Sequence, residues 1–168
     1  MWQMLRKSLS TGVVTETVDR PAVPGELAAE LDEKVKRLFG RSLHMRHVDT
    51  GSCNACDFEL TALLNPLYDL QRFGFDFVAS PRHADLLVVT GPVTHNLRTA
   101  LLRTVEATPR PRLILALGDC ACQGGPSAGS YATCGGAGGV VPVGLCIPGC
   151  PPSPERIIRG LLTAFDRL

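Results

Sequence analysis

With 168 residues, 45% of them hydrophobic and 20% charged, the chain has the composition of a globular protein and the length of one domain. The net charge of +1 argues neither for a nucleic-acid partner nor for an acidic ligand, and no nucleic-acid partner is expected. No apolar run approaches the length of a membrane-spanning helix, so we expect any link to a membrane to pass through partner proteins.

Residues 1–40 are expected to form an N-terminal arm and a helix that pack on partner subunits. The first residues contain Arg6 and Lys7 but no apolar signal segment and no twin-arginine pair, so we expect them to be retained in a cytoplasmic protein. Residues 1–25 could be a flexible tail, but their apolar content favours an arm that orders against a partner. Glu26–Phe39 is predicted to be helical, because its apolar residues recur at helical spacing.

From residue 41 to residue 168, apolar strand patterns alternate with helical patterns. The expected strands are Leu43–Val48, Phe75–Ala79, Ala84–Thr90, Arg112–Leu117 and Val140–Val143. The expected helices are Phe58–Leu70, broken or kinked at Pro66, then Asn96–Ala107 capped by Thr94, and Pro154–Phe165 capped by Ser153. Gly124–Gly139 is expected to be irregular.

This alternation predicts a mostly parallel sheet between two layers of helices, an α/β fold. Right-handed crossovers place the carboxyl ends of parallel strands at one edge, where ligand sites of open α/β sheets gather. Loops carrying cysteines leave three of the expected strands, so we expect a site at this edge.

The chain has seven cysteines, an odd number that cannot pair completely within one chain. In a cytosolic protein they are more often metal ligands than disulfides. Cys53 and Cys56 form a Cys-x-x-Cys turn between the first strand and a helix, and Cys120 and Cys150 follow later strand-like runs. Four thiols at one sheet edge indicate an iron–sulfur cluster or a zinc ion.

Spacing alone leaves several alternatives open. Structural zinc usually takes two compact ligand pairs, and the Cys-x-x-Cys turn also occurs as a redox dithiol. A flavin or nucleotide site is disfavoured, because no Gly-x-Gly-x-x-Gly opens a helix after the first strand. Cys122 competes with Cys120 as a ligand, while Cys122, Cys134 and Cys146 are otherwise expected to be buried small hydrophobic residues.

Several segments together resemble one family, the small cluster-bearing subunit shared by energy-converting (group 4) nickel–iron hydrogenases, formate hydrogenlyases and respiratory complex I, in which it is the B-type subunit. The matching segments are His47–Glu59 (HVDTGSCNACDFE), Ser80–Asp85 (SPRHAD), Thr90–Thr94 (TGPVT), Gly118–Gly125 (GDCACQGG), Val141–Val143 (VPV) and Pro148–Pro154 (PGCPPSP). They occur in the family's order, from about Leu43 to the end of the chain.

The resemblance implies a flavodoxin-like three-layer sandwich that binds one 4Fe-4S cluster. The ligands implied by the motifs are Cys53, Cys56, Cys120 and Cys150. Cys120 is preferred over Cys122 because it holds the family's position, four residues before the paired glycines. Quinone-reducing members have two adjacent cysteines at the first position, whereas the hydrogenase branch has the Cys-x-x-Cys present here.

The implied function is electron transfer without a complete active site in this chain. The cluster would relay electrons between ferredoxin-like iron–sulfur subunits and a hydrogenase-type large catalytic subunit, which would hold a nickel–iron centre. Integral membrane subunits would hold the complex, with this chain peripheral on the cytoplasmic side. The alternatives are the B-type subunit of a complex I-like NADH/ferredoxin–quinone oxidoreductase, or a nickel-free relative, and, from another class, a zinc-binding structural module.

Three further residues are candidates for supporting roles. Glu59 lies one helical turn beyond Cys56 and is a candidate for proton relay or for the interface. Arg82 and His83 are expected in a loop near the ligand edge, where they would tune the cluster; interface salt bridges are the simpler alternative. His44, His47 and His95 are expected to be structural.

Overall fold

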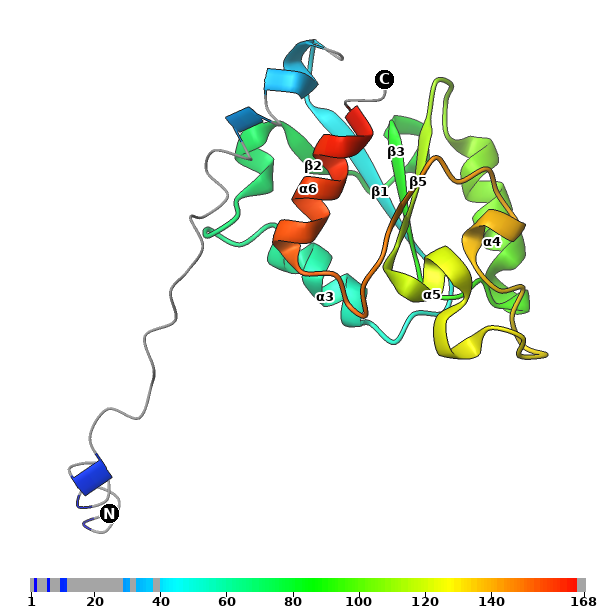
Figure 1. The fold of residues 1–168 in the computed structure, drawn as a ribbon. Helices are drawn as coiled ribbons and strands as arrows, with labels where there is room; N and C mark the ends of the chain where they lie inside the picture. The colour runs from blue at the N-terminus through cyan, green and yellow to red at the C-terminus, as the bar shows by residue number, and fades with distance from the viewer. Residues whose placement is uncertain are drawn as a thin grey trace.

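The computed structural model describes residues 2, 6, 10, 11, 29, 30, 33–37 and 40–165 (Figure 1). Its strands are β1 (Leu43–Asp49), β2 (Phe75–Phe77), β3 (Leu86–Thr90), β4 (Leu113–Leu117) and β5 (Leu145–Ile147). Its longer helices are α3 (Ala55–Ala62), α4 (His95–Ala107), α5 (Gly118–Gln123) and α6 (Pro154–Phe165). Short 3₁₀ turns cover Leu70–Phe73, Pro81–His83, Gly125–Ser127 and Ala137–Gly139.

The five strands form one parallel sheet in the order β2-β1-β3-β4-β5. This is the order of the flavodoxin-like doubly wound fold, and it confirms the predicted α/β class. All five residues of β3 are buried, as expected for a central parallel strand covered on both faces. The apolar run of β3 therefore accounts for its place in the middle of the sheet.

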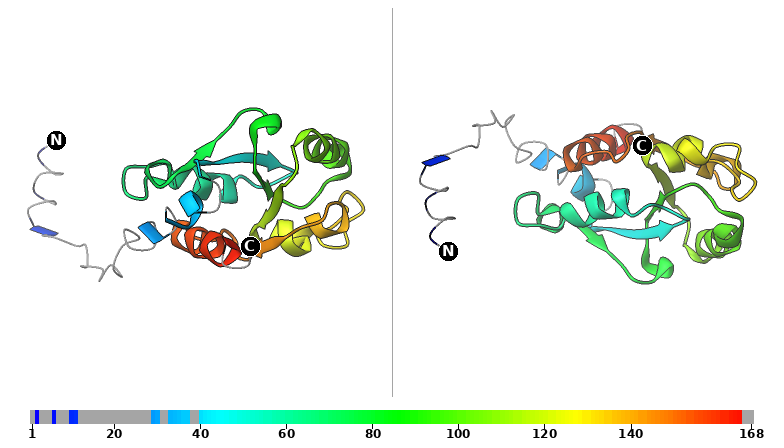
Figure 2. Two further views of the ribbon diagram at one scale, coloured as in Figure 1. Left: turned by 90° about the horizontal axis from the view of Figure 1, so that it is seen from above. Right: turned by 90° about the horizontal axis from the view of Figure 1, so that it is seen from below.

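Helices cover both faces of the sheet, which gives three layers (Figure 2). On one face, α3 and α6 pack on alternate strand residues such as Leu43, Met45 and Leu115. On the other face, α4 packs through Leu101 and Val105 on a second cluster that continues into α5. Because strand side chains alternate between the faces, each strand of the centre contributes to both cores.

Residues 29, 30 and 33–37 are helical, within the range expected for the helix Glu26–Phe39. Val35 is fully buried in the core on the α3 and α6 side, and Lys34 forms an ion pair with Glu30. The rest of that helix and nearly all of the expected arm, residues 1–25, lie outside the described residues. The division of the chain at residues 40 and 41 stays a prediction.

One expected helix ends earlier than predicted, and one observed helix was not expected. The helix after Cys56 begins at Ala55 and ends at Ala62, short of the expected Leu70, because Asn65 and Pro66 start a turn in which the Asn65 side chain accepts the N–H groups of Leu67 and Tyr68. Helix α5 was not predicted, since its six residues show no apolar periodicity.

The last strand is β5, not the expected Val140–Val143. Pro142 has no N–H group to give to a ladder, and pairing with β4 begins only at Gly144, whose N–H donates to the carbonyl of Ile114 at 2.9 Å. The expected cap at Ser153 is confirmed, since its side chain accepts the N–H of Arg156. Thr94 precedes α4 as expected, but its side chain makes no capping bond. Among the described residues, no helix combines the length and the hydropathy needed to cross a membrane.

Leu115, on β4, lies in the core on the α3 and α6 side with 1% of its surface exposed. We expect Leu115→Ala to lower the free energy of unfolding by about 2–5 kcal/mol, since it leaves a cavity between β4 and α6. Leu67→Ala is the matched control, because Leu67 is 55% exposed, and it should change stability by less than about 0.5 kcal/mol. The two denaturant midpoints, measured at equal metal loading, check this; equal losses for both variants would contradict it.

Candidate metal centre

Four cysteines lie on loops that leave the carboxyl edge of the sheet. Cys53 and Cys56 follow β1, with Cys56 in the first turn of α3. Cys120 lies in α5, directly after β4, and Cys150 lies between β5 and α6. Since all strands are parallel, these three segments start from the same edge, as the alternation of strands and helices predicted.

The electrostatics of Cys56 place the four thiols near one another. Burial raises the pKa of Cys56 to about 11, and the neighbouring charge of Asp57 adds to this effect. The remaining contributions come from three other thiols: Cys120, Cys53 and Cys150. Cys56 therefore keeps its proton at neutral pH in the metal-free chain, and a metal must displace this proton to bind sulfur.

The pKa of Cys120 is also shifted by two of these thiols. Burial raises its pKa first, followed by the charges of Cys150 and Cys53. Within the described part of the chain, however, no three His, Cys, Asp or Glu side chains converge tightly enough to hold a single metal ion. The charge effects of the thiols on one another thus indicate that the segments carrying them are neighbours.

Glycines make room where these segments approach each other. A Cβ added at Gly118 would lie 2.6 Å from Cys56 Sγ, and one at Gly125 would lie 2.7 Å from Cys120 Sγ. Gly118 has a φ of +87°, which a residue with a Cβ rarely adopts. Asp119 and Gly149 join the other two segments, since each donates its backbone N–H to an oxygen of the other at 2.9 Å.

The Cys-x-x-Cys turn is fixed by short side chains around it. Asp49 Oδ1 accepts the N–H groups of Gly51 and Ser52 at 2.8 and 2.7 Å, and Ser52 Oγ accepts the N–H of Asn54. Asn54, between the two cysteines, has a left-handed φ of 67°, which asparagine tolerates better than most residues. The turn can therefore present Cys53 to solvent while Cys56 points into the core.

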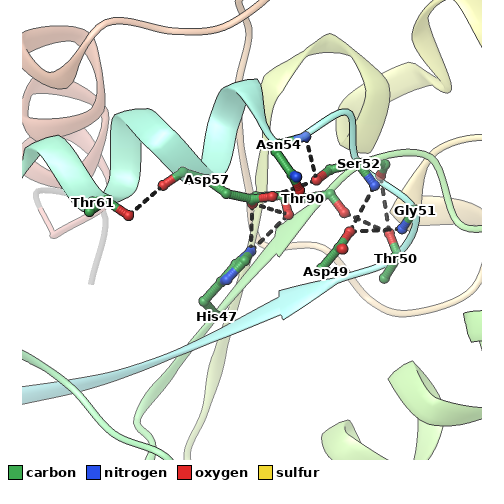
Figure 3. A network of polar contacts seen from close by, with 10 residues as sticks. His47, Asp49, Thr50, Gly51, Ser52, Asn54, Asp57, Thr61 and Thr90 are labelled. Atoms are coloured by element: carbon green, nitrogen blue, oxygen red, sulfur yellow. Dashed lines mark hydrogen bonds and ion pairs between the residues drawn. The ribbon is translucent and has the colours of Figure 1, made fainter.

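A polar network joins this turn to the middle of the sheet (Figure 3). Asp57 accepts hydrogen bonds from Ser52 Oγ at 2.6 Å and from Thr90 Oγ1 at 2.8 Å, and its Oδ1 lies 2.9 Å from His47 Nε2. His47 Nε2 also contacts Thr90 Oγ1 at 2.8 Å. Asp57 was not singled out from the sequence, although an acidic residue in the first turn of a helix is a recognisable signal. His47 was expected to be structural, and Asp57 and Thr90 are its partners in this network.

Glu59 lies on α3, one turn beyond Cys56, and is half-buried. Next to it, Phe58 is 72% exposed, and Leu64 and Leu67 beyond the helix are also exposed. These side chains form an exposed apolar surface on α3 and the turn beyond it, close to Cys56 in the sequence. The relay or interface role of Glu59 stays a prediction.

Arg82 and His83 lie elsewhere, and the expectation that they sit near the ligand edge is wrong. They form a 3₁₀ turn directly before β3, so they belong to the amino edge of the sheet, whereas the cysteines follow the carboxyl ends. There they line a cleft with Arg41, His44 and Arg110. This placement excludes direct contact between these two side chains and the four thiols.

The three remaining cysteines differ in their surroundings. Cys122 is half-buried; burial and then the neighbouring thiol of Cys146 raise its pKa to about 12. Cys134 is half-buried and lies 3.3 Å from His95 Nδ1. Cys146 is exposed, so the expectation that it is buried is wrong, because β5 is the edge strand of the sheet.

Known proteins with similar sequences match most of the chain. A subunit of Pyrococcus furiosus, "Probable membrane-bound hydrogenase subunit mbhJ", is 42% identical, over 82% of this chain and 84% of its own length. "Formate hydrogenlyase subunit 7" of Escherichia coli is 38% identical over 88% of this chain, which spans only 58% of that protein. The B-type subunit of the NADH-quinone oxidoreductase of Heliobacterium modesticaldum is 36% identical, over 92% of this chain and 85% of its own length.

Solved structures agree with the fold. A chain from the archaeal membrane-bound sulfane sulfur reductase superposes with a TM-score of 0.67 and 30% identity, over 82% of this chain and 74% of that one. A chain of an NAD⁺-reducing [NiFe]-hydrogenase has a TM-score of 0.56 and 18% identity, over 73% of this chain and 92% of that one, and supports the fold alone. The model of the family described as "NADH ubiquinone oxidoreductase, 20 Kd subunit" matches residues 53–164, and the chain belongs to this family.

Proposed function

We propose that the chain is an electron-transfer subunit with one 4Fe-4S cluster on Cys53, Cys56, Cys120 and Cys150. The observation that carries this proposal is the gathering of these four thiols at the carboxyl edge, beneath glycines that leave room beside two of the sulfurs. Four thiolates are the usual ligand set of such a cluster.

In this proposal the cluster supplies one-electron redox chemistry, and the chain's own residues hold and surround it. Cys56 and Cys120 provide sulfurs from the buried side, while Cys53 and Cys150 provide sulfurs from the exposed side. The Asp57 network fixes the turn that carries Cys53 and Cys56, so these sulfurs need little rearrangement on binding. This role needs no nucleophile or general base, and in this proposal the chain would have no complete active site of its own.

The proposed complex is a membrane-bound nickel–iron hydrogenase or a formate hydrogenlyase. One relative is named as a probable membrane-bound hydrogenase subunit and another as a formate hydrogenlyase subunit. The Cys-x-x-Cys spacing is the one that the resemblance implies for the hydrogenase branch. The proposed partners are a large catalytic subunit holding the nickel–iron centre, a ferredoxin-like iron–sulfur subunit and integral membrane subunits. The chain would be peripheral, on the cytoplasmic side.

The interface with the large subunit is proposed to include the exposed apolar side chains of α3 and the turn beyond it. Phe58 and Leu67 are the most exposed of these, and Glu59, next to Phe58 in the chain, is half-buried. Covering this surface would bring a partner next to Cys56 and would exclude water from the proposed cluster. Glu59 is our candidate for an interface or proton-relay residue there.

A second candidate function is that of the B-type subunit in a complex I-like quinone oxidoreductase, with NADH or ferredoxin as electron donor, or in a nickel-free relative. It is favoured by the relative from Heliobacterium modesticaldum. The Cys-x-x-Cys turn argues against the quinone-reducing form, which has adjacent cysteines at this position. A zinc-binding structural module is the alternative from another class.

Metal analysis of the complex that co-purifies with this chain, prepared without air, tests the proposal. We expect iron and acid-labile sulfide at about four atoms each for this chain's cluster, together with nickel from the partner. Iron and sulfide without nickel would favour the second candidate function. Zinc without iron, in a colourless sample, would refute electron transfer by this chain.

Replacing single cysteines identifies the ligands. We expect Cys120→Ser to lose most of the iron of this chain and its electron paramagnetic resonance signal, because a thiolate ligand is removed. Cys134→Ser is the matched control and should keep both, since Cys134 contacts His95 and not the four thiols. Loss of the signal in Cys134→Ser, with retention in Cys120→Ser, would contradict the proposed ligand set.

Alanine variants of two glycines with similar φ values distinguish the effect of a steric clash from the effect of backbone strain. Gly118 and Gly129 have φ values of +87° and +77°, but a Cβ at Gly129 would meet nothing within 4 Å. Gly129→Ala should cost about 1–2 kcal/mol of stability and leave iron binding intact. Gly118→Ala should cost more and also lower the iron content, because its methyl group meets Cys56 Sγ. Iron content and thermal unfolding of both variants check this; an unchanged iron content in Gly118→Ala would count against the site.

A further inference from the structure

We propose that Cys122 and Cys146 form a reversible disulfide on exposure to a peroxide. The pair would be an oxidant-responsive modification site, separate from the four cysteines of the proposed cluster. It accounts for two thiols that the electron-transfer role leaves unused.

The sheet brings the two cysteines together. Cys146 is the register partner of Ala116 across the β4–β5 ladder, so both side chains lie on the same face of the sheet. Cys122 Sγ donates to the carbonyl oxygen of Ala116 at 3.5 Å, which places Cys122 directly over this strand pair. Neighbouring strands are only about 4.8 Å apart, so the two thiols are within reach of each other.

The electrostatic environment of Cys122 agrees with this placement. After burial, the neighbouring Cys146 thiol raises the pKa of Cys122, and the backbone of Ile147 lowers it. Cys122 thus lies on α5 and faces the β4–β5 strand pair.

The two thiols differ in access, which assigns their roles. Cys146 is exposed on the edge strand, and Cys122 is half-buried on α5. The exposed thiol is therefore the one that a small oxidant meets first, and the half-buried one is the resolving thiol.

The reaction balances with hydrogen peroxide as the oxidant. Cys146 sulfur attacks one peroxide oxygen; the O–O bond breaks, an S–O bond forms, and the other oxygen leaves as water after taking the thiol proton. Cys122 sulfur then attacks the sulfenic acid; the S–S bond forms, the S–O bond breaks, and a second water leaves. Overall two thiols are oxidised to one disulfide, and one peroxide is reduced to two waters.

The bond would join the two segments that carry the last two proposed ligands. Cys122 lies two residues after Cys120 in α5, and Cys146 lies four residues before Cys150. Between them the chain runs through the glycine-rich segment 124–139, which has only short 3₁₀ turns. A disulfide would close this segment into a loop and hold α5 on β5.

Peptide mapping of the full chain within its co-purified complex tests the proposal. The sample is treated with stoichiometric hydrogen peroxide without air, free thiols are blocked with iodoacetamide under denaturing conditions, and the non-reduced digest is analysed by mass spectrometry. We expect a Cys122–Cys146 cross-linked peptide, lighter by about 2 Da than the sum of its two thiol peptides. It should disappear after treatment with dithiothreitol.

Two variants complete the test. In Cys146→Ser the cross-linked peptide should be absent and Cys122 should be recovered in its alkylated form. In Cys134→Ser, the matched control with a half-buried thiol outside the pair, the cross-link should form as in the wild type. The proposal is overturned if wild-type Cys122 and Cys146 both remain alkylated after peroxide, or if they are linked instead to Cys120, to Cys150 or to another cysteine.

Discussion

The close approach of three loops at the carboxyl edge of the parallel sheet is the constraint on which the rest of the structure depends. Gly118 and Cys56 come so near that even one methyl group would overlap with the sulfur. Such an approach is available only where strands β1, β4 and β5 end together and where the backbone can adopt a left-handed φ. The parallel order of the strands brings their ends together, and glycine allows the left-handed φ.

The polar network around Asp57 provides hydrogen-bond partners for polar groups at the same edge of the sheet. The loop after β1 leaves the sheet next to the C-terminal end of β3, and its polar groups would otherwise lose water without gaining partners. Asp57 accepts from side chains of both segments, and Thr50 Oγ1 donates to the carbonyl of Thr90 at 2.8 Å. Among the described residues, no buried side-chain nitrogen or oxygen lacks a partner. The turn is therefore held in place before anything binds to its thiols.

The parts of the fold that the sequence predicted are those with a strong local pattern. Strands β3 and β4 and helix α6 follow from apolar runs and helical periodicity, and the parallel order follows from their alternation. The sequence did not predict α5 or β5, which are short and are defined by pairing and packing with distant residues. Likewise, the role of Asp57 depends on its hydrogen bond with Thr90, which lies far along the chain. The predicted place of Arg82 was wrong because its motif was assigned to the wrong end of a strand.

The structure distinguishes the two cysteines of α5, which sequence spacing alone did not. On a helix, residues two apart point to different sides, so Cys120 and Cys122 cannot face the same group. Cys122 points to the sheet, where its sulfur contacts the carbonyl of Ala116. Cys120 faces the side on which Cys150 and Cys53 lie, as its electrostatic neighbours indicate. The helix therefore favours Cys120 as the proposed ligand, and it leaves Cys122 on the face of the sheet that also carries Cys146.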